Sequence, residues 1–308
     1  MNHAEQIRPS ILIVDDTAIN VEILLELLED HYDLSVALNG PDALALVHQQ
    51  AFDLILLDIV MPGMDGYEVC RALKSDAQTQ HIPVMFITGR TDENSIEAAF
   101  EAGGVDYVTK PFKPKELQAR VRTHLELQRL IRHLEYISSH DAMTGLYNRG
   151  RFFELALAAW DRQRDSMYAA MVDIDHFKRV NDTYGHPTGD KVIQGVAQTL
   201  KRVLGSHAIC GRIGGEEFAV VWPVADAATV DEDLEAMRQA VEALSTPAPN
   251  GLSVRCTISS GAVAADESMC HLDDLLKIAD DALYAAKGTG RNRAVFRHHA
   301  IITQDSPS

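Results

Sequence analysis

Gly214 and Gly215 are followed directly by Glu216 and Glu217, between two short apolar runs of this 308-residue sequence. Two glycines between apolar runs predict a β-hairpin, because Gly at the tip adopts positive φ without steric cost. Glycine also lets a ligand approach bare backbone closely, and carboxylate oxygens suit Mg²⁺. The stretch therefore indicates a metal-held phosphate lying against the backbone, although an ordinary solvated turn can have the same sequence.

A second acidic stretch, DIDHFK at residues 173–178, follows an apolar run upstream of the hairpin. Asp173 and Asp175 are two residues apart, so they lie on one face of an extended segment. If this segment pairs with the hairpin, Asp173 faces Glu216 and Glu217, and such carboxylates can hold two divalent ions for phosphoryl or nucleotidyl transfer. The alternative is that Asp173 caps the turn after its strand.

Four motifs lie in one order along residues 141–297. They are DAMTGLYNR at 141–149, DIDHFKRVNDTYGHPTGD at 173–190, RIGGEEF at 212–218 and AKGTGRNR at 286–293. With these motifs the segment resembles the GGDEF-type diguanylate cyclases in their GGEEF variant. Met143 stands where the family usually has Leu. The resemblance implies an α+β ferredoxin-like nucleotide-cyclase palm domain, with strands near Tyr168, His207, Phe218 and Ser253. It also implies that this domain condenses two GTP into cyclic di-GMP and two pyrophosphates.

The resemblance also implies a metal-dependent catalytic centre. Asp173 through its carboxylate and Ile174 through its carbonyl would bind two Mg²⁺ together with Glu216 and Glu217. Glu216 would accept the proton of the ribose 3′-hydroxyl. Lys178 would meet the triphosphate, where cations are needed.

A GTP pocket follows from the same resemblance, with Gly214 and Gly215 at its phosphate end. Asn181 and Asp190 would hydrogen-bond the guanine and His186 would make a further substrate contact. Two more cations, Lys287 and Arg291, would meet the triphosphate. By default these cations would be solvated partners of a helix dipole and the asparagine a turn residue. Their spacing from the metal motif favours the substrate role.

Short apolar runs alternate with amphipathic helical stretches in the first half of the chain. The runs are residues 11–14, 34–38, 54–57, 84–88 and 106–110. We expect five buried strands in a parallel sheet between helices, with helices at residues 20–29 and 42–48. Asp15, Asp16, Asp58, Thr88 and Lys110 all fall at the carboxyl ends of strands, where open α/β sheets bind ligands. Together they describe a Mg²⁺-dependent phosphoryl site.

This half resembles a response-regulator receiver domain of the α/β flavodoxin-like fold over residues 11–125. The matching stretches are VDD at 14–16, LLDIVMPGMDG at 56–66, Thr88 and YVTKPF at 107–112. The resemblance implies that a sensor histidine kinase phosphorylates Asp58. It also implies one Mg²⁺ between Asp15, Asp16, Asp58 and the Val60 carbonyl.

The switch residues also come from this resemblance. Thr88 and Lys110 would sense the new phosphoryl oxygens, and Tyr107 would be the aromatic switch. An acyl phosphate adds charge and acceptor oxygens, so drawing these groups inward reshapes the neighbouring face. The Lys110–Pro111 bond is expected to be cis.

A helix without Gly or Pro is predicted over residues 115–138, and it joins the two halves. Leu127, Leu130, Leu134 and Ile137 follow 3- and 4-residue steps, which is a short heptad seam. The stripe either packs on its own receiver, favoured before Leu125, or forms a coiled coil between two chains, favoured after it. Two GTP molecules need two facing half-sites, so we expect a homodimer controlled by phosphorylation. The predicted segments are a receiver at 8–125, a helical linker at 126–140, a GGDEF domain at 141–298 and a flexible tail at 299–308.

Composition excludes several classes of protein. The 28 basic and 45 acidic residues give a net charge of −17, which argues against nucleic acid or an anionic membrane as partner. We expect no membrane insertion and a cytoplasmic location, since there is no secretory signal pattern, no long apolar run and no CxxC spacing. A transcription regulator would need a basic recognition helix. A non-catalytic GTP-binding or partner-binding module, the remaining alternative, usually carries a broken motif, and none is broken here.

Overall fold

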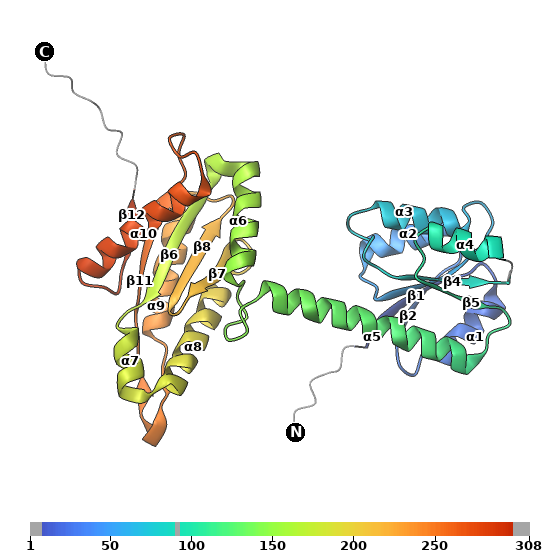
Figure 1. Ribbon diagram of the computed structural model, residues 1–308, viewed down its shortest axis with the longest axis horizontal. Coiled ribbons are helices and arrows are strands. Elements are labelled where there is room, and N and C mark those ends of the chain that lie inside the picture. The colour runs from blue at the N-terminus through green and yellow to red at the C-terminus, as the bar shows by residue number, and fades with distance from the viewer. Residues whose placement is uncertain (1–7, 90–92, 298–308) are drawn as a thin grey trace, which may run out of the picture. The chain divides into compact units, whose positions relative to one another are not determined.

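The computed structural model describes residues 8–89 and 93–297. The chain divides into two compact units, Met1–His133 and Leu134–Ser308, each built around its own sheet (Figure 1). The tail predicted at 299–308 lies outside the described residues. The domain boundaries given above stay predictions.

The first unit is a five-stranded parallel sheet, as predicted, and its strands lie in the order β2-β1-β3-β4-β5. Its strands are β1 (Ser10–Val14), β2 (Asp33–Ala37), β3 (Leu54–Asp58), β4 (Val84–Thr88) and β5 (Asp106–Thr109). Its helices are α1 (Ala18–Leu28), α2 (Gly40–Gln49), α3 (Gly66–Ser75), α4 (Glu93–Glu101) and α5 (Pro114–Ser139). β2 and β5 are only partly buried, because each lies at an edge of the sheet, so the expectation of five buried strands is wrong for these two.

Alternation along β1 explains the two layers of helices. Leu12 and Val14 pack with α2, α3 and α4, whereas Ile11 and Ile13 pack with α1 and α5 (Figure 1). Successive side chains of a strand point to opposite faces, so a continuous apolar run is what a strand covered on both faces needs.

The second unit has a five-stranded sheet in the order β12-β11-β6-β8-β7. Its strands are β6 (Tyr168–Ile174), β7 (Ile209–Gly214), β8 (Glu217–Trp222), β11 (Ile258–Ala264) and β12 (Ala294–Arg297). All pairings are antiparallel except that of β11 with β12. The order β11-β6-β8-β7, with helices crossing between β6 and β7 and between β8 and β11, is the ferredoxin-like arrangement that the sequence predicted.

Helices cover both faces of this sheet. They are α6 (Arg149–Gln163), α7 (Phe177–Tyr184), α8 (His186–Leu204), α9 (Ala227–Glu242) and α10 (Leu272–Gly288), with short 3₁₀ turns at Arg164–Ser166 and Pro249–Gly251. Helices α7, α8 and α9 pack on one face and α6 and α10 on the other. The strand expected near Ser253 is β10 (Ser253–Val254), which pairs with β9 (Thr246–Pro247) in a separate small sheet. The palm strand of this region is β11 instead.

Helix α5 runs unbroken over 26 residues. Leu117, Val121 and Leu125 are buried in the core of the first unit. Beyond them, Leu130 is 52% exposed and Leu134 65% exposed. Apolar packing on the first unit therefore ends at Leu125, as the sequence favoured, although Gln128 and Arg132 still bond to His81 and Asp53. The leucines beyond Leu125 form an apolar stripe without a partner among the described residues.

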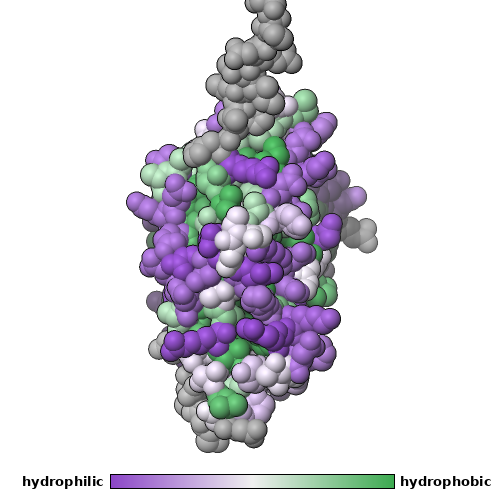
Figure 2. Space-filling model, turned by 90° about the vertical axis from the view of Figure 1, so that its left-hand side faces the viewer, coloured by the Kyte–Doolittle hydropathy of each residue, from purple (hydrophilic) through white to green (hydrophobic). Residues whose placement is uncertain are grey.

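The face shown in Figure 2 is mostly hydrophilic, with hydrophobic residues scattered between hydrophilic ones. No helix in the described parts of the chain has both the length and the apolar character that a membrane crossing requires. The four cysteines are free, and burial raises the pKa of the Cys210 thiol to about 12.

Candidate active site and phosphorylation site

The hairpin predicted at the two glycines is formed by β7 and β8. Gly214 pairs with Glu217, so Gly215 and Glu216 form the turn between them. Gly215 has a φ of +28°, and a Cβ placed on it would have no heavy atom within 4 Å. The backbone at this turn is therefore open to close approach by a ligand.

Arg212 holds the turn in place. Its Nε and Nη2 donate to the Gly215 carbonyl oxygen at 3.0 and 2.8 Å. Its Nη1 lies 3.1 Å from Asp141 Oδ1, at the start of the second unit. Burial would raise the pKa of Asp141, but hydrogen bonds from Thr144 and Arg212 lower it overall. One guanidinium thus ties the hairpin turn to the segment that follows α5.

The segment DIDHFK does pair with the hairpin. On β6, Asp173 lies opposite Glu217 of β8, and the Ile174 N–H donates to the Glu216 carbonyl oxygen at 3.4 Å. Asp173 is only 6% exposed. Burial and, to a smaller extent, the charges of Glu216 and Glu217 raise its pKa, although Lys287 opposes this. Negative charge is therefore concentrated beside the open turn.

The oxygen donors here fit magnesium. Carboxylates from Asp173, Glu216 and Glu217 with the Ile174 carbonyl make an all-oxygen set, which Mg²⁺ prefers. The cation already present is Lys287, whose Nζ lies 2.8 Å from Asp173 Oδ2. Within residues 8–89 and 93–297, the one set of three metal-ligating side chains that converges within 4.8 Å lies in the first unit. The acids of the second unit are spaced more widely.

Asn181 supplies a buried acceptor without a partner. Its Oδ1 accepts no hydrogen bond in the described structure, and a Cβ on Gly189 would lie 1.9 Å from that oxygen. A buried polar atom without a partner is rare and calls for an explanation such as an absent ligand. A guanine edge carries N–H donors, so this oxygen fits the predicted contact.

The other predicted substrate residues surround the same end of β6. Lys178 is exposed on α7, and His186 and Asp190 are exposed in the first turns of α8. Arg291 lies between α10 and β12 and is partly exposed. No hydrogen bond or ion pair fixes the side chains of Lys178, His186, Asp190 and Arg291 to another described residue, so their roles stay predictions.

Two positions were given no role by the sequence argument. Asp175 is 4% exposed and accepts hydrogen bonds from Thr257 and Ser259. Asn292 donates its backbone N–H to the same carboxylate. The spacing of Asp175 from Asp173 was a signal, but its partners come from distant segments that no local pattern links to it.

The first unit brings its predicted acids together. One oxygen each from Asp15, Asp16 and Asp58 lies within 4.8 Å of the others, at the carboxyl ends of β1 and β3. Gly66 lets α3 begin against this edge, because a Cβ there would lie 2.2 Å from the Asp58 carbonyl oxygen. Three carboxylates in one cluster fit a divalent cation, as the sequence predicted.

Lys110 bridges two of these acids. Its Nζ lies 2.8 Å from Asp15 Oδ2 and 2.9 Å from Asp58 Oδ2. Burial lowers the pKa of Lys110, but its hydrogen bonds to Asp15 and Asp58 outweigh this and raise the pKa overall. For Asp58, burial is the largest influence and raises the pKa, against hydrogen bonds from Lys110 and the Val60 N–H.

The predicted switch residues Thr88 and Tyr107 lie on the neighbouring strands β4 and β5. Thr88 is buried at the end of β4, and its carbonyl oxygen accepts the Lys110 N–H at 2.8 Å. The Tyr107 ring is partly buried and meets Phe100 edge to face, with 6.3 Å between ring centroids. The Lys110–Pro111 bond is cis, as expected.

Comparison with protein families matches both halves of the chain. Residues 138–293 match the model described as "Diguanylate cyclase, GGDEF domain". Residues 11–122 match the response regulator receiver domain.

Two relatives place the match in known proteins. Response regulator PleD of Caulobacter vibrioides is 30% identical over 298 residues, which cover 92% of this chain and 65% of PleD. The probable diguanylate cyclase DgcT of Escherichia coli is 38% identical over 163 residues, covering 52% of this chain and 36% of DgcT. This chain thus spans less than two thirds of the length of either relative.

A solved structure extends the comparison to the fold. The coiled coil and GGDEF domain of DgcB from Caulobacter crescentus, in complex with c-di-GMP, is 34% identical, with a TM-score of 0.53 over 59% of this chain and 99% of that one. Together with the family matches, this shows that the chain belongs to the GGDEF family and carries a receiver domain ahead of its GGDEF domain.

Proposed function

We propose that this protein is a diguanylate cyclase that condenses two GTP into cyclic di-GMP and two pyrophosphates under the control of Asp58. The observation that carries the proposal is the pairing of Asp173 with Glu217 on neighbouring strands, beside the open backbone of Gly215. Buried negative charge next to bare backbone suits a nucleoside triphosphate with its cations. Membership of the GGDEF family supports the same reaction.

Each of the two phosphodiester bonds formed in the reaction needs one proton acceptor and one leaving group. The ribose 3′-oxygen of one GTP attacks the α-phosphorus of the other, and a new O–P bond forms. The bond from that phosphorus to the oxygen bridging to the β-phosphate breaks, and pyrophosphate leaves with the electron pair. Glu216 accepts the hydroxyl proton as general base. The same step repeated in the opposite direction closes the ring.

Asp173, the Ile174 carbonyl, Glu216 and Glu217 would hold two Mg²⁺ in this site. Bound magnesium would neutralise charge on the triphosphate and on the oxygens that attack and leave. Lys178, Lys287 and Arg291 would add fixed positive charge along the phosphates.

Recognition of guanine rests on the orphaned Asn181 oxygen. Asn181 and Asp190 would accept N–H bonds from the guanine edge, and His186 would make a further contact. One domain holds one GTP and is a half-site. We therefore propose a homodimer in which the exposed stripe of α5 pairs two chains and raises the effective concentration of the facing domains.

The receiver supplies the control in this account. A sensor histidine kinase would transfer a phosphoryl group to Asp58, with one Mg²⁺ held by Asp15, Asp16, Asp58 and the Val60 carbonyl. The support is the acidic cluster and the Lys110 bridge across it. The cytoplasmic location predicted from the sequence stays a prediction.

The test of the catalytic proposal is incubation of the purified protein with GTP and MgCl₂, with products resolved by chromatography and mass. The wild-type protein is expected to release cyclic di-GMP and pyrophosphate. Glu216→Gln is expected to bind GTP and release neither, because the general base is gone. Wild-type protein that binds GTP, is dimeric and forms no product would support the non-catalytic GTP-binding module instead.

A further inference from the structure

The carboxylate of Asp175 holds three donors at the end of β6 and has no assigned role in the reaction. Its oxygens accept hydrogen bonds from Thr257 Oγ1 at 2.7 Å, Ser259 Oγ at 2.7 Å and the Asn292 backbone N–H at 3.0 Å. None of the ion pairs found in the described residues includes Asp175, which is 4% exposed. A buried carboxylate without a cation is costly, and here its two oxygens accept hydrogen bonds from all three donors.

The segment that Asp175 binds, Arg291 and Asn292, has an unusual backbone conformation. Arg291 has a φ of +62° and Asn292 a φ of +48°, in the left-handed region that residues other than glycine rarely adopt. Two consecutive residues of this kind persist only where their surroundings hold them. The contacts that hold Asn292 are therefore needed for the backbone conformation of Arg291 and Asn292.

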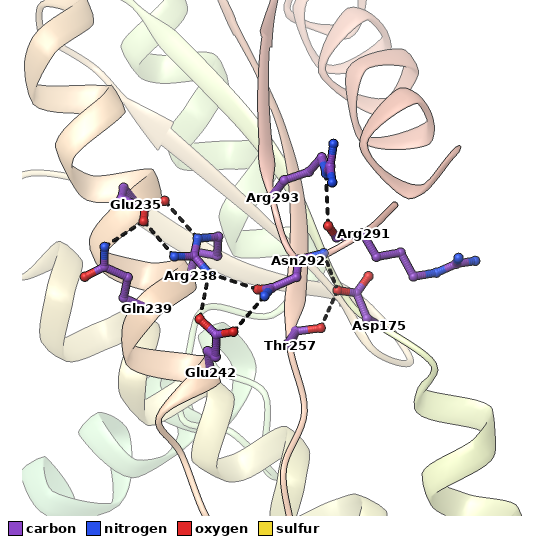
Figure 3. A network of polar contacts seen from close by, with 9 residues as sticks. All are labelled: Asp175, Glu235, Arg238, Gln239, Glu242, Thr257, Arg291, Asn292 and Arg293. Carbon is purple, nitrogen blue, oxygen red and sulfur yellow. Dashed lines mark hydrogen bonds and ion pairs between the residues drawn. The ribbon is translucent and has the colours of Figure 1, made fainter. Parts of the chain in front are cut away.

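The backbone N–H of Asn292 and both polar atoms of its side chain take part in that hold (Figure 3). Its N–H donates to Asp175, its Nδ2 donates to Glu242 Oε1 at 2.8 Å, and its Oδ1 accepts from Arg238 Nη1 at 3.1 Å. Arg238 is fixed in turn by two hydrogen bonds to Glu235, which together with Glu242 raise its pKa. The Arg291 side chain extends away from this network (Figure 3).

Asp173 and Asp175 bind the two ends of the segment from Lys287 to Asn292. Asp173 pairs with Lys287 at 2.8 Å, and Asp175 binds the Asn292 N–H. The residues between carry Arg291, the second cation that would meet the triphosphate. The positions of Asp173 and Asp175 at the end of β6 thus set the positions of Lys287 and Arg291.

We propose that Asp175 is a positioning residue that fixes the left-handed turn at Arg291 and Asn292 and so aims the Arg291 guanidinium at the phosphates of bound GTP. This inference rests on the proposed function, because it uses Arg291 as a phosphate ligand. Asp175 itself touches no substrate.

The test measures binding of a non-hydrolysable GTP analogue with Mg²⁺ to the full chain by equilibrium dialysis. Arg291→Ala is expected to weaken binding about 10-fold or more, the size of one lost hydrogen bond to a charged group. Asp175→Ala is expected to weaken it to a similar degree. The double variant should bind the analogue with the affinity of the single variant that binds less tightly, and not more weakly. The reason is that both substitutions remove the same contact. A purely structural role for Asp175 would give effects that add.

Asp175→Asn separates geometry from charge. Its amide oxygen still accepts the Asn292 N–H, and its nitrogen can donate to the Ser259 hydroxyl, so binding is expected near the wild-type level. The matched control is Asp226→Ala, which removes a carboxylate that caps α9 through the Thr229 N–H at 2.8 Å. This control should leave analogue binding unchanged.

Wild-type binding by Asp175→Ala, or additive losses with Arg291→Ala, would overturn the inference. If Asp175→Ala does not fold, Thr257→Val can replace it, because it removes one donor to the Asp175 carboxylate. Thr257→Val should lower the affinity for the analogue by less, and combining it with Arg291→Ala should cause no further loss of affinity. Product analysis of the wild-type protein separates the two claims. Binding without product overturns the cyclase proposal and leaves the binding comparison valid, whereas wild-type protein that binds no analogue overturns both.

Discussion

At the scale of single residues, Gly189 shows how a missing side chain makes room for the candidate guanine contact. A Cβ at this position would lie 1.9 Å from Asn181 Oδ1, so Gly189→Ala must displace the Asn181 amide. We expect the dissociation constant for GTP to rise about 10-fold or more, the effect of losing a hydrogen bond in a buried site. Equilibrium dialysis with a GTP analogue measures it.

The control for Gly189→Ala is Gly150→Ala in α6. There the new Cβ would lie 3.6 Å from Asn148 Oδ1, which is an ordinary contact. This variant should bind GTP normally, since Gly150 is exposed in the first turn of α6. Unchanged affinity in a folded Gly189→Ala protein would contradict the role given to Asn181.

Arg212 makes contacts that lysine cannot reproduce. A single ammonium cannot bond the Gly215 carbonyl through two nitrogens and reach Asp141 as well. We expect Arg212→Lys to lower kcat about 10-fold, through loss of one or two hydrogen bonds of about 1 kcal/mol each, with a small change in melting temperature. Arg164→Lys, whose lost contact is to the Met269 carbonyl, is the control. A wild-type kcat for Arg212→Lys would show that the hydrogen bonds of Arg212 to the turn are not needed for turnover.

Glu235 gives the second unit a pH dependence of stability. Hydrogen bonds from Arg238 and then Gln239 lower its pKa from 4.5 to about 2. Protons therefore bind more tightly to the unfolded chain, so this stabilisation is complete above pH 4.5 and is lost as the pH falls through 2. The group is largely solvated, so the effect is small.

Urea unfolding of the wild-type protein and Glu235→Gln across this pH range measures the contribution. The wild-type protein should be the more stable at the upper end, and the difference should vanish at the lower end. A difference that does not change with pH would contradict the assigned ion pair.

At the scale of elements, the second half of α5 is an apolar stripe without a described partner. Leu130 and Leu134 are 52% and 65% exposed, so changing both to Glu removes no core contact. Burying a leucine in an interface contributes roughly 1.5–3 kcal/mol, so we expect the wild-type protein to be dimeric and the double variant to be monomeric. Light scattering and product formation should fall together.

The matched control is Arg129→Glu, an exposed position on the same helix that lies away from the heptad seam and changes the charge by as much as the double variant does. It should keep both the dimer and the activity. A double Leu variant that remains dimeric would show that another surface pairs the chains.

The elements also show what the sequence could and could not predict. β1, β3 and β4 are continuous apolar runs, so their position was predictable from local pattern. β11 was missed because its sequence, ISSGAVA, is built of small residues. They are small because α10 packs closely on them: a Cβ on Gly261 would lie 2.0 Å from the Leu283 nitrogen. Close packing of this kind leaves a weak hydrophobic signal.

At the scale of the whole molecule, both units concentrate acids at strand ends and offset them with one lysine. Lys110 bridges Asp15 and Asp58 in the first unit, and Lys287 pairs with Asp173 in the second. Local motifs were enough to predict these residues. The grip of Asp175 on Asn292 joins residues 117 apart, so it became visible only when the fold brought β6 and the end of α10 together.

The central claim is that phosphorylation of one unit controls nucleotide condensation by the other. The most direct measurement is the rate of cyclic di-GMP formation by the full chain with GTP and Mg²⁺, with and without a small-molecule phosphodonor. We predict that the phosphodonor raises the rate for the wild-type protein and leaves Asp58→Ala at its basal rate. Equal rates for the phosphorylated protein and Asp58→Ala would contradict the account.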